Sequence, residues 1–279
     1  NNMNSSVAYV YSFLPTDFGR VNDAMMESAT DNAVYTWENN SIYYIANGIW
    51  SPLKRVDDGW NFWNGVRSAN LFLENFDPKV LERFQYNEDY DEMIEKASKF
   101  SLEVRFLRAF YLFELAKRYG DIPLITRTYT QEDINSVRKT SFAEVVDFIA
   151  KECTEITREG GLLEDAVRGE TGRVTKGAAL ALKSRALLYA ASELHNPGHE
   201  LKKWEAAAKA AYEVINMNKY QLPKIAADPL YSDLGGNEIL KSKQLIFERR
   251  ATATTSDFES RNEPMGYEGA EGGNTPTQN

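Results

Sequence analysis

Residues 103–115 have the sequence EVRFLRAFYLFEL, and this stretch decides the fold. Its apolar positions continue a spacing of three and four residues that begins upstream, which is the period of one helix face. We expect a helix over residues 88–119, the longest in the chain, with Gly120 at its end and Pro123 shortly beyond. The residues that define the apolar face are Phe100, Val104, Leu107, Tyr111 and Leu115.

The same period predicts helices on both sides of this stretch. They span residues 4–14, 59–76, 141–158, 174–194 and 201–217. The last two are rich in alanine and joined by a short turn, as in a tetratricopeptide-type helix pair, although no clean repeat of about 34 residues recurs. The predicted fold class is mainly α: an irregular α-solenoid of tetratricopeptide-like helical repeats, with long loops and little strand.

Local sequence features mark helix ends and one core position. Ser141 with Glu144 three residues later forms a capping box, and Thr175 can cap the alanine-rich helix. Cys153, the one cysteine, continues the apolar face of residues 141–158, so we expect a buried free thiol. A chain with one cysteine forms no internal disulfide.

We expect one domain with three portions. These are a loop-rich portion (15–58), the helical repeats (59–217) and an irregular portion (218–279), together making the single domain 1–279. Residues 244–248 (QLIFE) are a strand candidate without an evident partner, and the glycine-rich residues 266–279 contain no closing element. We therefore expect more chain to follow residue 279.

Composition excludes several classes of protein. Lys and Arg total 32 against 41 Asp and Glu, a formal charge of -9, and no basic patch offsets this field, so nucleic-acid binding is not expected. No stretch approaches about 20 consecutive apolar residues. The first residues, NNMN, do not begin a signal peptide, so the protein is either cytosolic or begins after its leader.

Candidates for metal or catalytic chemistry are weak. His195 and His199 are four apart, but Pro197 and Gly198 between them predict a turn, so no metal site is expected. Residues 169–176 lack the spacing of a phosphate loop, and no cofactor is expected. Paired carboxylates are abundant, yet none is marked as the pair, about 5–10 Å apart, that glycoside hydrolysis needs.

Aromatic residues concentrate in the loop-rich portion, among amides and charges. Sugars have apolar CH faces and hydroxyl edges, so aromatic rings flanked by polar side chains can hold them. We expect Trp60 and Trp63 to lie in the core, because they begin a helix that is apolar on two sides. The candidate ligand site consists of stacking by Trp37 and Trp50 and hydrogen bonds from Asp31, Asn39, Asn40 and Arg55.

Four segments resemble the SusD/RagB-like starch-binding proteins of Bacteroidetes. Residues 60–74 (WNFWNGVRSANLFLE) are similar to the family's helix of the form W-x-x-[YW]-x-x-I-x-x-A-N-x-F-L-E. Residues 103–124, from EVRFLRAFYLFEL to YGDIPL, are similar to its central signature. Residues 172–191 begin GRVTKGAA and end LYAA, as in the next motif, and residues 272–278 (GGNTPTQ) look like the segment after the repeats.

The resemblance implies a lipoprotein at the outer-membrane surface that binds a glycan and delivers it to a TonB-dependent, SusC-like transporter. It implies four tetratricopeptide-type helix pairs and a loop-rich C-terminal half, which we expect this chain to lack along with the leader and its lipidated cysteine. Membrane contact would occur only through that lipid anchor. Glu103, Arg105 and Arg108 match the signature, and we expect them to make structural contacts between helices.

Non-catalytic binding of an oligosaccharide or polysaccharide is the leading hypothesis. One alternative is a tetratricopeptide-like scaffold that docks on the transporter without touching sugar. The other is a glycoside hydrolase of helical fold. The prediction that the ligand is a glycan comes from the family resemblance. The predicted site residues come only from the composition of the loop around Trp37.

Overall fold

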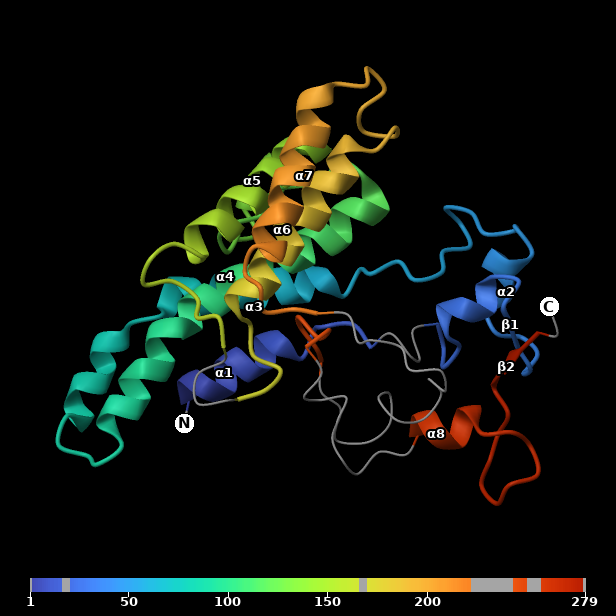
Figure 1. Cartoon of the computed structure of the whole chain (residues 1–279), viewed down its shortest axis with the longest axis horizontal. Helices are drawn as coiled ribbons and strands as arrows, with labels where there is room; N and C mark the ends of the chain where they lie inside the picture. Colours follow the sequence, from blue (N-terminus) through green and yellow to red (C-terminus); the bar gives the residue numbers. More distant parts are fainter. Residues whose placement is uncertain (1, 17–20, 166–169, 222–242, 250–256, 278–279) are drawn as a thin grey trace. The chain divides into compact units, whose positions relative to one another are not determined.

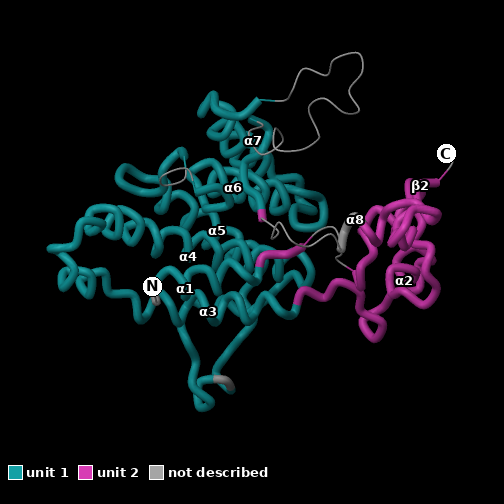
Figure 2. Tube along the Cα trace, turned by 90° about the horizontal axis from the view of Figure 1, so that it is seen from below, with its two compact units in different colours: residues 1–13, 60–248 teal, residues 14–59, 249–279 magenta. Residues whose placement is uncertain are grey.

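The computed structural model describes residues 2–16, 21–165, 170–221, 243–249 and 257–277. The chain divides into two compact units (Figure 2). Unit 1 comprises Asn1–Phe13 and Trp60–Glu248, and unit 2 comprises Leu14–Gly59 and Arg249–Asn279. The single domain expected over residues 1–279 stays a prediction.

Unit 1 is an array of helices, and each helix packs against the next from α3 to α7 (Figure 1). This confirms the predicted, mainly α fold class. No described helix is both long enough and apolar enough to cross a membrane. The α-helices are α1 (Asn2–Tyr11), α3 (Phe62–Asn75), α4 (Tyr90–Tyr119), α5 (Phe142–Ile156), α6 (Lys176–Ala191) and α7 (Leu201–Ile215), with short 3-10 helices η2 (Pro78–Phe84) and η3 (Asp133–Ser136).

The predicted helix faces and caps form as expected. All five residues of the α4 face are buried. Gly120 ends α4 at φ +69°, a conformation that glycine adopts without steric cost, and its N–H donates to the Ala116 carbonyl at 2.8 Å. Ser141 and Glu144 form the capping box of α5. Cys153 is fully buried on α5, and this burial raises the pKa of its thiol to about 12.

Gly65 sets how closely α3 approaches α4. A Cβ atom at this position would lie 2.6 Å from the Tyr111 ring, so only glycine fits without displacement. The Tyr111 ring stacks on Phe62 at 5.9 Å, and its hydroxyl donates to the Val10 carbonyl of α1 at 2.5 Å. Tyr111 therefore joins three helices in one contact.

Buried and half-buried polar side chains connect α4 to its neighbours, which confirms the structural role predicted for three of them. Arg105 pairs with Glu152 at 2.7 Å, and Arg108 donates to the same carboxylate at 3.1 Å. Arg108 also donates to Asn70 Oδ1 of α3 at 3.0 Å. Glu103 accepts from the Tyr11 hydroxyl at 2.5 Å. Each of these side chains has at least one hydrogen-bond partner, which offsets the cost of removing it from water.

Unit 2 is built around a short antiparallel strand pair. β1 (Ala33–Tyr35) pairs with β2 (Asn274–Pro276), and Val34 lies opposite Thr275. The 3-10 helix η1 (Met26–Ala29) and α2 (Ile42–Ala46) contact each other, and α8 (Asp257–Asn262) contacts β2. The core of this unit consists of Val21, Ala24, Tyr35 and Ile42.

Two expectations for the C-terminal portion are wrong. Residues 266–279 were expected to hold no closing element, but β2 lies within them and pairs with β1. The partner strand is about 240 positions earlier in the sequence, and three residues are too few to show a period. Residues 244–248 form no strand, and the described Phe247 instead packs edge-on against Phe106 of α4 at 5.4 Å.

Candidate functional site

Trp37 lies two residues after β1 and is fixed in place while half exposed. Its indole Nε1–H donates to the Glu271 carbonyl at 3.0 Å, and the side chain is 51% exposed. Glu271 belongs to a segment closed by backbone bonds, since its own N–H donates to the Ser260 carbonyl at 2.7 Å. A backbone acceptor in a closed segment holds the ring more firmly than a side chain would. The ring is therefore a preoriented surface.

The three polar residues predicted near Trp37 have different surroundings. Asn39 is exposed in a turn at φ +65°. The exposed Asp31 accepts a hydrogen bond from Thr277 Oγ1 on its backbone carbonyl at 2.5 Å. Asn40 is engaged at both ends of its amide: Nδ2 donates to the Asn22 carbonyl at 2.7 Å, and Oδ1 accepts from the Ile42 N–H at 2.9 Å. The amide keeps one N–H and one lone pair beyond these two bonds, so a ligand could still use it.

Trp50 and Arg55 follow α2 on an exposed turn. Trp50 is 61% exposed, and its N–H donates to the Tyr44 carbonyl of α2 at 2.9 Å. Arg55 forms an ion pair with Asp58 at 3.9 Å, both side chains being largely exposed. Exposed ion pairs of this kind contribute little to the free energy of folding. Arg55 can therefore leave Asp58 and bind a ligand at a small cost in free energy.

All six predicted site residues lie in unit 2, within Leu14–Gly59. Asp31 and Trp37 are held by the C-terminal segment through Thr277 and Glu271. Asn40 and Trp50 are attached to α2, the first at its start and the second through Tyr44. The arrangement offers two exposed indole rings with hydrogen-bonding groups nearby in sequence. Their joint use as a ligand site stays a prediction.

The described ranges contain no metal-binding cluster, and Glu103, whose carboxyl has a raised pKa, is buried. No group of three or more His, Cys, Asp or Glu side chains there could hold a metal ion. His195 and His199 lie in a turn, as predicted, and His195 stacks on Phe142 at 3.6 Å. Burial raises the pKa of Glu103 to about 7, but this carboxyl is enclosed by Tyr11 and Arg173 and is 3% exposed. It cannot reach a polysaccharide.

One expectation about the aromatic residues is wrong. Trp60 was expected in the core but is 58% exposed, because α3 begins only at Phe62 and leaves Trp60 on the preceding turn. Trp63 is half-buried on α3. The adjoining asparagines, Asn61 and Asn64, were the sequence features that could have indicated a surface position.

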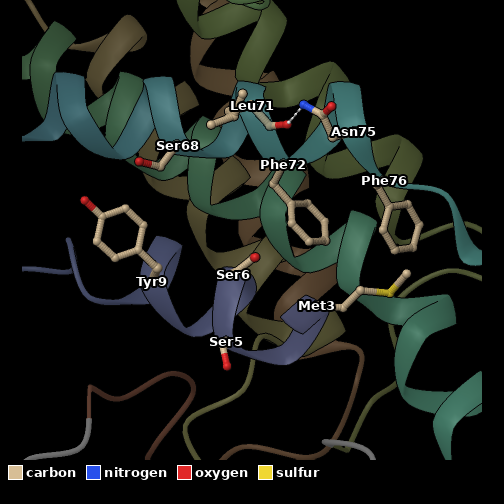
Figure 3. Close-up of a pocket in the computed structure, with 9 residues that line it drawn as sticks. All are labelled: Met3, Ser5, Ser6, Tyr9, Ser68, Leu71, Phe72, Asn75 and Phe76. Carbon is tan, nitrogen blue, oxygen red and sulfur yellow. Dashed lines mark hydrogen bonds between the residues drawn. The ribbon is translucent and has the colours of Figure 1, made fainter. Parts of the chain in front are cut away.

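Sequence reasoning also missed a groove of about 600 Å³ within unit 1, between α1 and α3 (Figure 3). The Phe72 ring of α3 and the Ser6 hydroxyl of α1 both point into the space between the helices. It contains none of the predicted site residues. The groove is lined by Met3, Ser5, Ser6, Tyr9, Ser68, Leu71, Phe72, Asn75 and Phe76.

Comparison with known proteins identifies the family. A family model for SusD-like proteins, described as "Starch-binding associating with outer membrane", matches residues 6–188. A SusD-like protein from Bacteroides fragilis is similar in structure, with a TM-score of 0.74 and 26% identity over 99% of this chain and 51% of that chain. No curated protein sequence matches this chain.

Two further solved structures share the fold. A SusD-like carbohydrate binding protein from Bacteroides fragilis has a TM-score of 0.58 and 24% identity over 79% of this chain and 41% of its own. Surface glycan-binding protein A from Bacteroides thetaiotaomicron, in complex with laminarihexaose, has a TM-score of 0.60 and 16% identity over 88% of this chain and 48% of its own. This chain spans about half the length of these relatives. Since the family model covers most of its residues, the chain belongs to the SusD-like family of starch-binding proteins associated with the outer membrane.

Proposed function

We propose that this chain binds an oligosaccharide or polysaccharide without catalysing its cleavage, and that Trp37 is the central contact. The observation that carries the proposal is the half-exposed indole ring whose N–H is anchored on the Glu271 carbonyl. A ring fixed before the ligand arrives loses little side-chain entropy on binding. Sugar CH groups would stack on its face, and Asp31, Asn39 and Arg55 would bond hydroxyl groups at the edge.

We further propose that the protein acts at the outer-membrane surface, held by a lipid anchor, and delivers its glycan to a TonB-dependent, SusC-like transporter. The family description, which names starch binding and outer-membrane association, supports this setting. The laminarihexaose complex of the Bacteroides thetaiotaomicron relative supports a glycan as the ligand. This chain spans about half of that relative's length.

Affinity electrophoresis tests the proposal. Wild type, Trp37→Ala and Trp37→Phe would run in native gels containing amylopectin or laminarin. Wild type should be retarded, Trp37→Ala should lose about tenfold or more in affinity, and Trp37→Phe should be intermediate because it keeps a ring but loses the anchoring N–H. Trp204→Ala is the control, since Trp204 is 44% exposed on α7 and belongs to unit 1. Equal retardation of all variants would remove Trp37 from the site.

A second candidate function, protein docking through the helical repeats, is favoured by an apolar stripe on α7. Leu201, Trp204, Tyr212 and Ile215 recur at helical spacing and are all exposed. Exposed apolar patches of this kind often mark contacts between proteins. Replacing Leu201 and Ile215 with Ser should abolish binding to the transporter and leave glycan retardation unchanged. Unchanged transporter binding would dismiss this candidate.

A further inference from the structure

Two asparagines of the chain are each followed directly by a glycine, Asn47 by Gly48 and Asn64 by Gly65. In such a pair the backbone nitrogen of the glycine can attack the side-chain amide carbon of the asparagine, because glycine carries no Cβ that obstructs the approach. The attack needs an asparagine side chain that is free to turn and a backbone that is free to open after it. The two pairs share this chemistry, so their surroundings decide which one reacts.

Asn47 lies at the end of a short helix and is open to solvent. It is the exposed C-cap residue of α2, and Gly48 after it is exposed at φ +65°. The side-chain amide of Asn47 makes no hydrogen bond within the described part of the chain. A Cβ built on Gly48 would find nothing within 4 Å. Both residues therefore have room to move toward each other.

One hydrogen bond restrains the attacking nitrogen. The Gly48 N–H donates to the Ile45 carbonyl at 2.9 Å. This bond closes the last turn of α2, a helix of five residues, and the last turns of helices open at little cost in free energy. The nitrogen is thus released each time the end of α2 frays.

Asn64 has the opposite surroundings. Its Nδ2 donates to Asn61 Oδ1 at 2.8 Å, and it belongs to the first turn of α3, a helix of 14 residues. Gly65 is buried, and a Cβ there would lie 2.6 Å from the Tyr111 ring of α4. Freeing the Gly65 nitrogen means opening α3 where it packs against α4 (Figure 1). This opening costs more free energy than the fraying of a helix end.

We propose that Asn47 is a site of spontaneous deamidation and that Asn64 is protected from it by α3. The Gly48 nitrogen loses its proton to a solvent base and bonds to Asn47 Cγ, and the side-chain nitrogen leaves as ammonia. The cyclic imide that forms takes up one water molecule, which breaks either of the two C–N bonds of the ring. The products are aspartate and isoaspartate, and only water is consumed.

The modification would change the turn that carries Trp50. The N–H groups of Ile49 and Trp50 both donate to the Tyr44 carbonyl of α2 at 2.9 Å. Isoaspartate at position 47 lengthens the backbone by one carbon atom between this carbonyl and its two donors, so both hydrogen bonds should weaken. The inference goes beyond the proposed function and does not depend on it, because it holds whether or not this turn contacts a glycan.

The test incubates the folded full chain in mildly alkaline buffer and follows both asparagines by peptide mapping with mass spectrometry. Trypsin cleaves after Lys54 and Arg55, so the two sites fall into separate peptides. Asn47 should deamidate at least about tenfold faster than Asn64, since each ~1.4 kcal/mol of opening free energy changes a rate tenfold. In denaturant the two rates should become similar, because each asparagine is followed by glycine and then by a β-branched residue.

Asn47→Gln is the matched control, since glutamine keeps the amide but would have to close a larger and less favourable ring. It should lose the product at position 47 and keep the wild-type melting temperature. After incubation, the amides of Ile49 and Trp50 should exchange hydrogen faster in wild type than in Asn47→Gln.

Each outcome supports the proposal or overturns it. Faster modification of Asn47 than of Asn64 in the folded chain, with similar rates in denaturant, supports it. Equal or reversed rates in the folded chain, or a difference of the same size in denaturant, overturn the protection by α3. If Asn47 is modified in denaturant but not in the folded chain, the bond to Ile45 persists and the site is overturned. Equal hydrogen exchange in incubated wild type and Asn47→Gln overturns the predicted effect on the turn.

Discussion

At Gly65, a single hydrogen in place of a side chain sets the spacing of α3 and α4. We predict that Gly65→Ala lowers the free energy of unfolding by about 1–3 kcal/mol, because the added methyl group would meet the buried Tyr111 ring at 2.6 Å. Urea unfolding measures the change. Gly198→Ala is the control, since nothing lies within 4 Å of its added Cβ, and it should be near neutral. If Gly65→Ala were as stable as Gly198→Ala, the close approach of Gly65 to the Tyr111 ring would be contradicted.

Glu103 makes stability depend on pH. Burial is the largest cause that raises its pKa to about 7 from 4.5, against the opposing effects of Arg173 and the Tyr11 hydrogen bond, and Glu170 adds to the rise. The folded protein therefore holds a proton that the unfolded chain releases. This contribution is complete below about pH 4.5 and is lost as the pH rises through about 7, on the order of 3 kcal/mol in all.

The measurement is the free energy of unfolding of wild type and Glu103→Gln from pH 4.5 to 8. Glutamine keeps the shape but cannot titrate, so wild type should lose stability relative to the variant as the pH rises. The other titrating groups are common to both proteins and cancel in the difference. Parallel pH profiles would show that Glu103 keeps an ordinary pKa.

Among single residues, the sequence predicted burial better than exposure. Cys153 and the α4 face are buried as expected, because helical spacing places a side chain on a face directly. Trp60 was misplaced because exposure depends on where a helix begins, and α3 begins at Phe62, three residues after the predicted start at residue 59. The hydrogen bonds of the Asn40 side chain could not be predicted either, because one partner, Asn22, lies in another loop 18 residues earlier.

At the scale of elements, the sequence predicts those helices and strands whose stabilising contacts join residues close together in the chain. The helices α4 and α5 depend on contacts three and four residues apart and on caps such as Ser141, which lie next to one another in the chain. The pairing of β1 with β2 depends on residues at opposite ends of the chain. A three-residue strand has no period to recognise, and its partner decides whether it forms.

Asn274 fastens β2 to unit 2, and its loss should loosen the strand pair. Its Oδ1 accepts from the Met25 N–H at 2.8 Å and from Ser28 Oγ at 2.9 Å. We predict that Asn274→Ala speeds hydrogen exchange of the Thr36 amide, which donates to the Gly273 carbonyl, by about tenfold or more. The amide of Ala179 in α6 serves as the internal control. Equal exchange at Thr36 in both proteins would mean that Asn274 does not anchor the strand.

At the scale of the whole molecule, the helical family motifs and the predicted ligand residues lie in different compact units. Unit 1 holds the helices whose motifs carry the family resemblance, whereas unit 2 holds Trp37, Trp50 and the other predicted ligand residues. The family could be recognised from long helical motifs because packing constrains them. The ligand residues could be predicted only by type and place, because loop surfaces are free to vary. Neither the glycan nor its contacts follow from the helical pattern.

Isothermal titration calorimetry with laminarihexaose and with a maltooligosaccharide of similar length tests glycan binding through Trp37 most directly. We predict that wild type binds at least one of the two, and that Trp37→Ala weakens this binding about tenfold or more, while Trp204→Ala binds as wild type. Matched melting temperatures would exclude unfolding as the cause. Binding of the same strength in Trp37→Ala and wild type would contradict the account.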